Sequence, residues 1–424
     1  MQIFAQRRTQ LLNQIADNSL VILAAAPEYP FTSGVNYPYH QDSYFYYLTG
    51  LSSTPAYLVL YKIKQQVTSL LLTPVNTAKD ELWHGKKPAL AQLQQQYKFD
   101  RVEDIAQTNQ IIQPLIEQVQ KVYLDTGKLE QNEQLAQILT SHGEIAKLAN
   151  VRPLIDQMRL IKDSLELDNM RRAVEISTQA HLEVMRECRP GSYEYTLAGK
   201  FVGHCISSGA AHQGYPPIVA AGANALTLHY TDNNQPLQDG DLLLIDAACE
   251  YNHYSADITR TYPVNGKFSS EQAAIYQLVL DAQQAAIAVI KPGVAYELIH
   301  AAAVECLVSG LLELKILTGD KQQIIADKAY QEFYPHSTGH WLGLDVHDVG
   351  NYKLDGQSMP LQENMLLTVE PGLYIRSGSS AASKWHGIGV RIEDDILVTS
   401  STAEVLSAQV PKAIAEISRV MRGG

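Results

Sequence analysis

The sequence is poor in cysteine, in basic residues and in long apolar runs. Its four cysteines, Cys188, Cys205, Cys249 and Cys306, include no Cys-x-x-Cys pair. This excludes a disulfide framework and is typical of reduced thiols in a cytoplasmic protein. Lys and Arg number 33 against 45 Asp and Glu, a net charge of -12, so we expect no nucleic-acid partner. No apolar stretch reaches the roughly 18 residues of a transmembrane helix, so we expect no membrane association.

The residues that are present are typical of a globular protein. The 424 residues, 46% of them apolar and 18% charged, are enough for two domains with buried cores. Residues 19–26 follow Arg7 and Arg8 and faintly resemble the apolar part of a signal peptide. Asp17 and Asn18 interrupt that pattern, and the run has the length of a strand, so a buried β-strand is favoured.

Residues 1–160 alternate strand-like and helix-like segments, which predicts a small α/β domain. The expected strands are residues 19–26, 56–63 and 66–73, and the expected helices are residues 90–96 and 111–119. An aromatic-rich stretch, residues 37–47, is typical of internal packing or of an oligomer contact. A charged, helix-favouring segment then begins a second domain, for which we expect residues 161–424.

The second domain contains an internal repeat. Arg189-Pro190-Gly191 recurs as Lys291-Pro292-Gly293, and each triplet separates two amphipathic segments. The four expected helices are residues 168–186, 195–207, 271–290 and 296–312. Cys205 and Ser208-Gly209 also recur 101 residues later, as Cys306 and Ser309-Gly310. Two chance turns are the alternative; a real repeat predicts a pseudo-symmetric domain whose central site takes residues from both halves.

Two aspartates share a predicted β-hairpin. Apolar residues flank Asp246, and Asn252-His253 offers a two-residue turn, which places position 257 opposite position 248. Asp246 and Asp257 then point to the same face as diagonal neighbours. Two carboxylates on one apolar face repel each other unless a cation lies between them, so the pair predicts a metal ion. A register shift of one residue would remove this arrangement.

Three histidines, His336, His340 and His347, lie within twelve residues beside several glycines. The spacing of the first two resembles that of a helical zinc motif. Pro335 and Gly339 oppose a helix, and the glutamate of that motif is missing, so we reject it. The cluster still indicates a site more than a core.

Glu370 and Glu393 each lie in a strand-like apolar run, where an unpaired charge would be costly. A salt bridge with Arg391 would account for one of them, but not for two glutamates and two aspartates. An oxygen-rich set with one imidazole suits two divalent ions about 3.5 to 4 Å apart, with Mn²⁺ favoured over Zn²⁺. The members of this set are Asp246, Asp257, His340, Glu370 and Glu393.

The order Asp, Asp eleven residues later, His, Glu and Glu resembles that of the pita-bread metallopeptidases. This family includes methionine aminopeptidase, prolidase and aminopeptidase P. Four segments resemble the proline-specific branch of this family: residues 227–230, 336–348, 369–374 and 387–394. Residues 36–50 and 81–85 are similar to the N-terminal domain of aminopeptidase P, a domain that methionine aminopeptidases usually lack.

The resemblance implies an α/β N-terminal domain and an α+β pita-bread catalytic domain with pseudo-two-fold symmetry. It implies an Xaa-Pro aminopeptidase that acts on peptides with proline at the second position. Asp257 and Glu393 would bridge two metal ions, Asp246 would complete the shell of one, and His340 and Glu370 that of the other. Glu370 would also be the general base, and hydroxide from the metal centre the nucleophile.

The resemblance also implies roles for residues around the metals. His229, His336 and His347 would orient the carbonyl, stabilise the oxyanion and line the proline pocket. Arg391 matches an arginine behind the ligands, and a structural pairing with a ligand carboxylate is equally compatible. Trp83 is the candidate for a residue that reaches the active site of a neighbouring subunit in a dimer or tetramer. Packing within its own domain is the alternative.

Two other functions remain open at this point. Prolidase, which cuts only Xaa-Pro dipeptides, would share the metal centre, and only the phrases in the first domain favour aminopeptidase P over it. A non-catalytic pita-bread binding protein, or a metal-free hydrolase on the same fold, would have lost metal ligands. All five are present here.

Overall fold

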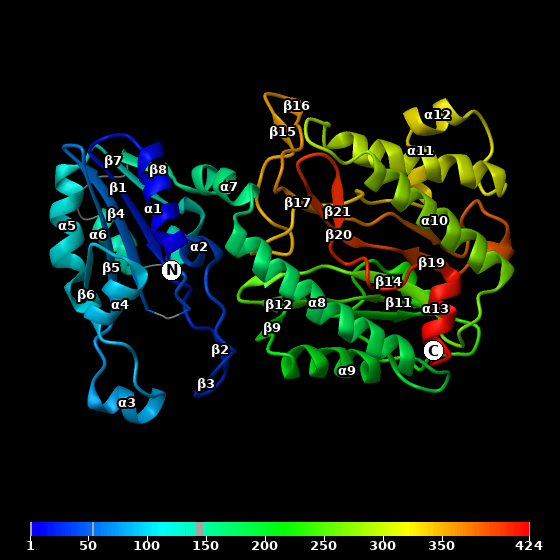
Figure 1. The fold of residues 1–424 in the computed structure, drawn as a ribbon, viewed down its shortest axis with the longest axis horizontal. Helices are drawn as coiled ribbons and strands as arrows, with labels where there is room; N and C mark the ends of the chain where they lie inside the picture. Colours follow the sequence, from blue (N-terminus) through cyan, green and yellow to red (C-terminus); the bar gives the residue numbers. More distant parts are fainter. Residues whose placement is uncertain (1, 53–54, 132, 141–146, 424) are drawn as a thin grey trace. The chain divides into compact units, whose positions relative to one another are not determined.

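The computed structural model describes residues 2–52, 55–131, 133–140 and 147–423. The chain forms two compact units, Met1–Arg159 and Leu160–Gly424 (Figure 1). Each unit has its own hydrophobic core. In the part of the chain so described, no helix is long and apolar enough to cross a membrane.

The first unit is built on a mixed six-stranded sheet with the order β6-β5-β4-β1-β7-β8 (Figure 1). Its central strand β1 is antiparallel to β4 and parallel to β7, and its residues are buried up to Leu23. The expectation of a buried strand after Asn18 is therefore confirmed. The strands are β1 (Ser19–Ala24), β4 (Tyr57–Ile63), β5 (Gln66–Thr73), β6 (Arg101–Asp104), β7 (Lys121–Leu124) and β8 (Leu148–Asn150).

The helices of the first unit begin with α1, which precedes β1, and end with α7, which follows β8 and reaches the first residue of the second unit. They are α1 (Gln2–Gln14), α2 (Ser43–Thr49), α3 (Ala78–His84), α4 (Leu90–Tyr97), α5 (Thr108–Gln118), α6 (Glu133–Thr140) and α7 (Arg152–Leu160). A small hairpin, β2 (Pro30–Thr32) and β3 (Val35–Asn36), stands outside the main sheet. In the aromatic-rich stretch, Tyr44, Phe45 and Tyr47 of α2 are buried, whereas Tyr37 is exposed.

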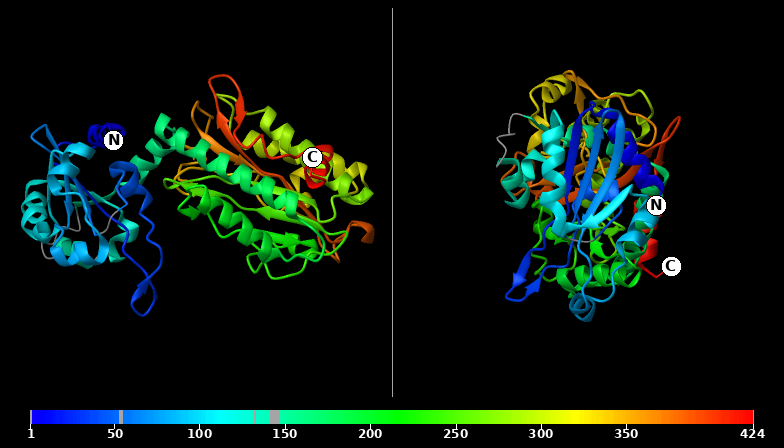
Figure 2. Two further views of the ribbon diagram at one scale, coloured as in Figure 1. Left: turned by 60° about the horizontal axis from the view of Figure 1, so that its bottom comes forward. Right: turned by 90° about the vertical axis from the view of Figure 1, so that its left-hand side faces the viewer.

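The second unit contains the four expected long helices, with ends that differ from the predictions by four residues or fewer. α8 packs against α9, and α10 against α11 (Figure 2). α8 begins at a capping box formed by Asp163 and Glu166, which satisfies backbone N–H groups of its first turn. The helices are α8 (Ser164–Glu187), α9 (Glu194–Ser207), α10 (Ser270–Ala288), α11 (Glu297–Glu313), α12 (Lys321–Ala326) and α13 (Ile414–Met421).

The strands of the second unit form small antiparallel sheets. In the first half they are β9 (His212–Gln213), β10 (Ile218–Ala221), β11 (Leu242–Asp246), β12 (Cys249–Tyr251), β13 (Tyr254–Ser255) and β14 (Thr259–Pro263). In the second half they are β15 (Lys353–Leu354), β16 (Gln357–Ser358), β17 (Leu366–Val369), β18 (Gly372–Ile375), β19 (Ile388–Arg391), β20 (Asp394–Val398) and β21 (Ala403–Val405). The sheet orders are β10-β11-β14, β13-β12-β9, β17-β20-β21, β18-β19 and β15-β16.

The internal repeat has a structural counterpart. Gly191 and Gly293 both have φ +85°, a left-handed conformation that favours glycine. In each half, this glycine and the residue three positions later donate their N–H groups to a returning segment. The four bonds are Gly191 to Leu237, Glu194 to Gln235, Gly293 to Leu361 and Tyr296 to Met359, with N···O distances of 2.9, 3.0, 2.8 and 2.9 Å. The two halves therefore share one backbone framework.

One part of the predicted repeat is wrong. Ser208-Gly209 ends α9, with Gly209 in a left-handed conformation, whereas Ser309-Gly310 lies inside α11. Gly310 has a packing role instead, since a Cβ there would lie 2.2 Å from a methyl group of Leu278. The two pairs are similar in sequence but not in structure.

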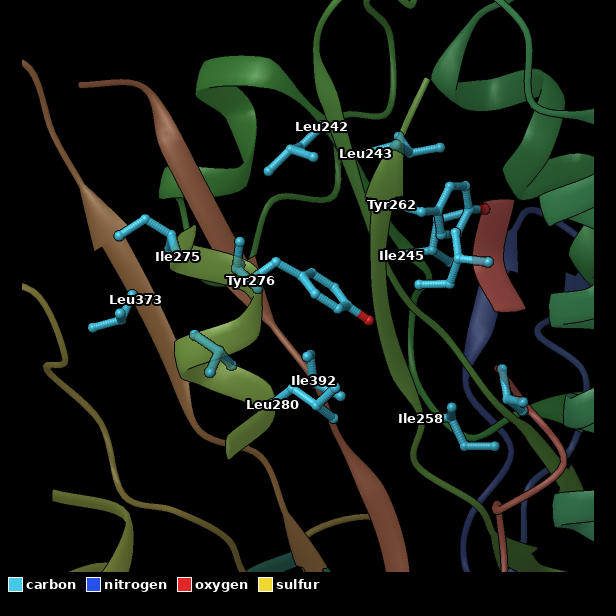
Figure 3. Close-up of a cluster of buried hydrophobic side chains, with 14 of the residues drawn as sticks. Leu242, Leu243, Ile245, Ile258, Tyr262, Ile275, Tyr276, Leu280, Leu373 and Ile392 are labelled. Atoms are coloured by element: carbon cyan, nitrogen blue, oxygen red, sulfur yellow. The ribbon is translucent and has the colours of Figure 1, made fainter. Parts of the chain in front are cut away.

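The main core of the second unit holds the strand that carries Asp246. Figure 3 shows Leu243 and Ile245 of β11 and Tyr262 of β14 in one buried cluster with α10 residues such as Tyr276. Each fully buried aliphatic side chain of this kind stabilises the fold by about 1.5 to 3 kcal/mol. The end of β11 is therefore a rigid place for a functional side chain.

Candidate metal centre and active site

A pocket of about 550 Å³ in the second unit gathers nine of the ten residues predicted to form a site. They are His229, Asp246, Asp257, His336, His340, His347, Glu370, Arg391 and Glu393. The tenth, Trp83, lies in α3 of the first unit with 71% of its surface exposed. The alternative that Trp83 packs within its own domain is therefore wrong.

The two aspartates lie as the hairpin predicts. Asn252 and His253 both have positive φ, 48° and 68°, which is typical of a two-residue hairpin turn. Glu250 pairs with Ser255 and Asp246 with Thr259, so position 257 falls opposite position 248. The predicted register is confirmed, and Asp246 and Asp257 both face the pocket.

A close backbone approach sets the position of His340. The chain from 335 to 340 is not helical, which confirms the rejection of a helical zinc motif. A Cβ at Gly339 would lie 1.9 Å from the carbonyl oxygen of Thr368, so glycine is required there. The backbone N–H of His340 then donates to Oγ1 of Thr368 across 3.0 Å, which fixes the loop against β17.

The two glutamates lie at strand ends and not within strands, which corrects the prediction. Glu370 directly follows β17, and its N–H donates to the carbonyl of Thr338 across 2.7 Å. Glu393 lies in the break between β19 and β20, where it accepts a 2.6 Å hydrogen bond from the hydroxyl of Thr259. A neighbouring segment thus holds the backbone of Glu370 and the carboxylate of Glu393.

The ligand atoms of Asp257, His340 and Glu393 lie within 4.8 Å of one another. Nε2 of His340 is 3.3 Å from Oδ2 of Asp257 and 3.8 Å from Oε1 of Glu370. Among the described residues, Oδ1 of Asp246 is buried and accepts no hydrogen bond. A buried carboxylate oxygen that points into a cluster of anions requires a cation.

The electrostatics of the cluster favour the same conclusion. Burial is the main cause that raises the pKa of Glu393 well above its usual value, and the negative charge of Asp257 is the next. Burial also raises the pKa of Glu370 to about 7. Burial would lower the pKa of His340, but the hydrogen bond and charge of Asp257 outweigh it and raise that pKa to about 9. The carboxylates therefore attract any positive charge available.

The donor set fits divalent metal ions. Nδ1 of His340 lies 2.9 Å from the carbonyl of Trp341, so an Nδ1–H tautomer directs the lone pair of Nε2 toward the carboxylates. Four carboxylates and one imidazole are the oxygen-rich ligands of hard or borderline divalent ions. Residues on both halves of the pseudo-symmetric unit contribute to the set, as the repeat predicts.

A chain of hydrogen-bonded side chains lies beside the ligand cluster. Arg391 donates through Nη2 to Oδ2 of Asp246 across 2.5 Å and through Nη1 to the hydroxyl of Tyr374 across 3.0 Å. That hydroxyl lies 3.0 Å from Nε2 of His336. Burial, assisted by the charge of Arg391, lowers the pKa of His336 to about 4, so this imidazole is neutral near pH 7.

Sequence reasoning missed three residues that hold side chains of the predicted site. The hydroxyl of Tyr215 donates to Oδ1 of Asp257 across 2.6 Å, and Tyr374 and Thr259 make the contacts described above. Thr259 could have been found, because it shares the strand face of Asp257. Tyr215 is 42 residues from its partner, and no local pattern marks it.

Comparison with known proteins identifies the family. The model of metallopeptidase family M24 matches residues 168–400, and that of the aminopeptidase P N-terminal domain matches residues 4–123. The chain belongs to metallopeptidase family M24. The expected fold is confirmed: an aminopeptidase P-type N-terminal domain followed by a pita-bread domain.

Relatives of this M24 peptidase match it along nearly its whole length. The Xaa-Pro aminopeptidase of Haemophilus influenzae is 38% identical and covers 99% of this chain and 96% of its own; that of Escherichia coli is 38% identical and covers 99% and 97%. The structure of Pseudomonas aeruginosa aminopeptidase PepP has a TM-score of 0.95 at 40% identity, with 99% and 97% covered. The structure of Escherichia coli aminopeptidase P with the inhibitor Pro-Leu has a TM-score of 0.94 at 38% identity. The match covers 100% of this chain and 98% of that one.

Proposed function

We propose that this M24 peptidase is an Xaa-Pro aminopeptidase, a hydrolase that releases the first residue of peptides with proline at the second position. The observation that carries the proposal is the pocket, where five predicted metal ligands lie together with three histidines. The printed names of relatives that align over 99% of the chain support the same activity.

Two divalent ions would be held by Asp246, Asp257, His340, Glu370 and Glu393, and we favour Mn²⁺ because four of the five ligands are carboxylates. By resemblance to the pita-bread metallopeptidases, Asp257 and Glu393 would be the ligands shared by the two ions, and both lie with His340 in one tight group of donors. When bound, the ions would polarise the scissile carbonyl and make hydroxide available near neutral pH.

Glu370 is the proposed general base. Its carboxylate faces the pocket beside His340 and would accept a proton from the nucleophile and return it to the leaving nitrogen. The hydrogen bond from its backbone to Thr338 fixes the start of the β17–β18 connection, so the carboxylate is presented to the pocket.

The three histidines have two proposed tasks. His336, neutral and hydrogen-bonded to Tyr374, lines the proline pocket. His229 and His347 also face the cavity and would donate to the carbonyl oxygen as negative charge develops on it. The ring of His347 lies 4.2 Å from that of His340, between centroids, which places it beside the ligand cluster.

We also propose that the enzyme is cytoplasmic and forms a dimer or tetramer. Three of the four cysteines are buried as free thiols, which is consistent with a reducing compartment. Phe31 and Tyr37 of the β2–β3 region stack edge to face yet are 63% and 55% exposed, which is typical of an interface. Trp83, also exposed, is the proposed contact to the active site of another copy.

Product analysis by mass spectrometry tests the function. Mn²⁺-loaded protein is incubated with an Arg-Pro-Pro-type peptide, a matched peptide with alanine at position two, and Xaa-Pro dipeptides. We expect release of the first residue from the Arg-Pro-Pro-type peptide and none from the alanine control. Cleavage confined to the dipeptides would show a prolidase instead. Absence of cleavage with metal bound would contradict the proposal.

A further inference from the structure

Glu194, the first residue of α9, is a buried carboxylate, and its hydrogen-bond donors among the described residues are all neutral. Its side chain is fully buried and accepts four hydrogen bonds from neutral donors. The four donors and their distances are Ala221 N, 2.8 Å, and Asn224 Nδ2, 2.9 Å, to Oε1, and Tyr230 Oη, 2.7 Å, and Gln235 N, 2.9 Å, to Oε2. Since burying a charge is costly, a carboxylate at this position needs a specific reason.

All four donors belong to one segment, residues 221–235, which leaves β10 and returns toward β11. Ala221 and Gln235 stand at its two ends, and Tyr230 lies next to His229. One carboxylate therefore holds both ends of the segment and the point beside His229, whose side chain faces the pocket.

The aromatic ring of Tyr230 strengthens this attachment. It packs against a small buried cluster of Ile218, Ala220, Ala225 and Leu244. Its hydroxyl points to Glu194, so the residue adjacent to His229 is held at its ring and at its hydroxyl. Because the ring and the hydroxyl of Tyr230 are both held in place, the backbone of the adjacent His229 has little freedom to move.

The other half of the pseudo-symmetric unit contains an equivalent arrangement. Tyr296 takes the place of Glu194 in the shared backbone framework. Its hydroxyl donates to the carbonyl of Gly339 across 2.6 Å, directly before His340. In both halves, the residue three positions after the left-handed glycine fixes a loop that carries a histidine of the pocket.

We propose that Glu194 is a positioning residue for His229, which it holds in the pocket by fixing the 221–235 segment. The inference rests on the proposed function, in which His229 contacts the scissile carbonyl. Glutamate serves better than glutamine here because hydrogen bonds to a charged acceptor are stronger. The amide nitrogen of glutamine would also face two donors that it cannot accept from.

The test is a double-mutant cycle between Glu194→Gln and His229→Ala, measured as kcat/KM on the Arg-Pro-Pro-type peptide. We expect E194Q alone to lower kcat/KM by about tenfold or more, mainly through kcat, with unchanged metal content. In the H229A background the same change should cost less than about twofold, because the residue through which Glu194 acts is already absent.

Two further variants keep the test decisive. Glu166→Gln is the matched control: Glu166 is a buried carboxylate in the first turn of α8, where it caps the helix. E166Q should lower the melting temperature and leave kcat/KM within about twofold. Tyr230→Phe removes one of the four bonds and should show a smaller loss that also vanishes in the H229A background. If E194Q does not fold, Y230F carries the same cycle.

The outcomes separate this inference from the function on which it rests. A wild-type enzyme without Xaa-Pro cleavage overturns the proposed function and the positioning role with it. Wild-type activity with equal fold-losses for E194Q in both backgrounds overturns the positioning role alone. Wild-type kinetics for E194Q do the same.

Discussion

Nη2 of Arg391 lies 2.5 Å from Oδ2 of Asp246, while Nη1 of the same guanidinium contacts the hydroxyl of Tyr374. Asp246 thus has one oxygen held by a fixed cation and, within the described residues, the other left for a ligand in the pocket. A planar guanidinium can make both contacts at once, whereas the single ammonium of lysine cannot. Arg391 therefore connects the predicted metal site to the wall of the proposed proline pocket.

Arg391→Lys should lower kcat/KM by about 10- to 100-fold and weaken metal binding, because the orientation of Asp246 and Tyr374 is lost. Kinetics on the Arg-Pro-Pro-type peptide and metal analysis after dialysis measure the two effects. Arg171→Lys is the control, since Arg171 pairs with Glu404 at the surface, and it should change neither. Wild-type kinetics and metal content in R391K would show that the paired contacts of the Arg391 guanidinium have no functional role.

Metal removal should make stability depend on pH. In the metal-free protein, burial raises the pKa of Glu370 from 4.5 to about 7. The folded-state pKa of Glu370 exceeds that of the unfolded chain, so its protonation contributes to the free energy of unfolding. This contribution to stability is complete below pH 4.5 and is lost as the pH rises through about 7. The melting temperature of metal-depleted protein, prepared with a chelator, should therefore fall between about pH 4.5 and 7 relative to that of metal-loaded protein.

The control for this pH effect is Glu370→Gln, which removes the titrating group. Its chelated form should lose part of the pH dependence between about 4.5 and 7. Identical profiles for the chelated wild type and the chelated variant would show that Glu370 does not titrate in this window.

Lys162 and Asp348 form a buried ion pair, 2.6 Å apart, with each side chain 1% exposed. Lys162→Met should destabilise the protein by about 3 to 5 kcal/mol, because removing one partner of a buried ion pair is strongly destabilising. The double variant Lys162→Met, Asp348→Leu should recover much of that loss. Urea unfolding of the three proteins measures the difference. A loss under about 1 kcal/mol in K162M, the range of an exposed pair, would contradict this assignment.

Trp83→Ala should leave stability within about 0.5 kcal/mol of the wild type, because the side chain is 71% exposed. If Trp83 contacts the active site of another copy, kcat/KM should fall while the melting temperature does not. Leu82→Ala is the matched control, since Leu82 is adjacent and 82% exposed, and it should leave kcat/KM unchanged. Unchanged kinetics and unchanged oligomeric state in W83A would rule out the role.

The sequence sufficed for those parts of the site that local geometry determines. The turn at Asn252-His253 specifies the hairpin register, and the register places Asp246 and Asp257 on one face. The buried strand β1 and the four long helices follow equally from apolar periodicity. These features depend on neighbours within a few residues along the chain.

Contacts between distant segments could not be predicted in the same way. Tyr215 reaches Asp257 from 42 residues away, and Glu194 collects its four donors from a segment 27 to 41 residues farther on. Such pairs form only after the strands and helices have packed. The Ser-Gly repeat shows the opposite failure, since two similar dipeptides fall in different structures.

The central claim is that the cluster of Asp246, Asp257, His340, Glu370 and Glu393 is a two-metal centre for Xaa-Pro hydrolysis. Its most direct test is a titration of chelated protein with Mn²⁺, following release of the first residue from an Arg-Pro-Pro-type peptide. We predict no activity without metal and a rise that levels off at about two ions per chain. Full activity in the chelated protein, or no activity at any metal ratio, would contradict the account.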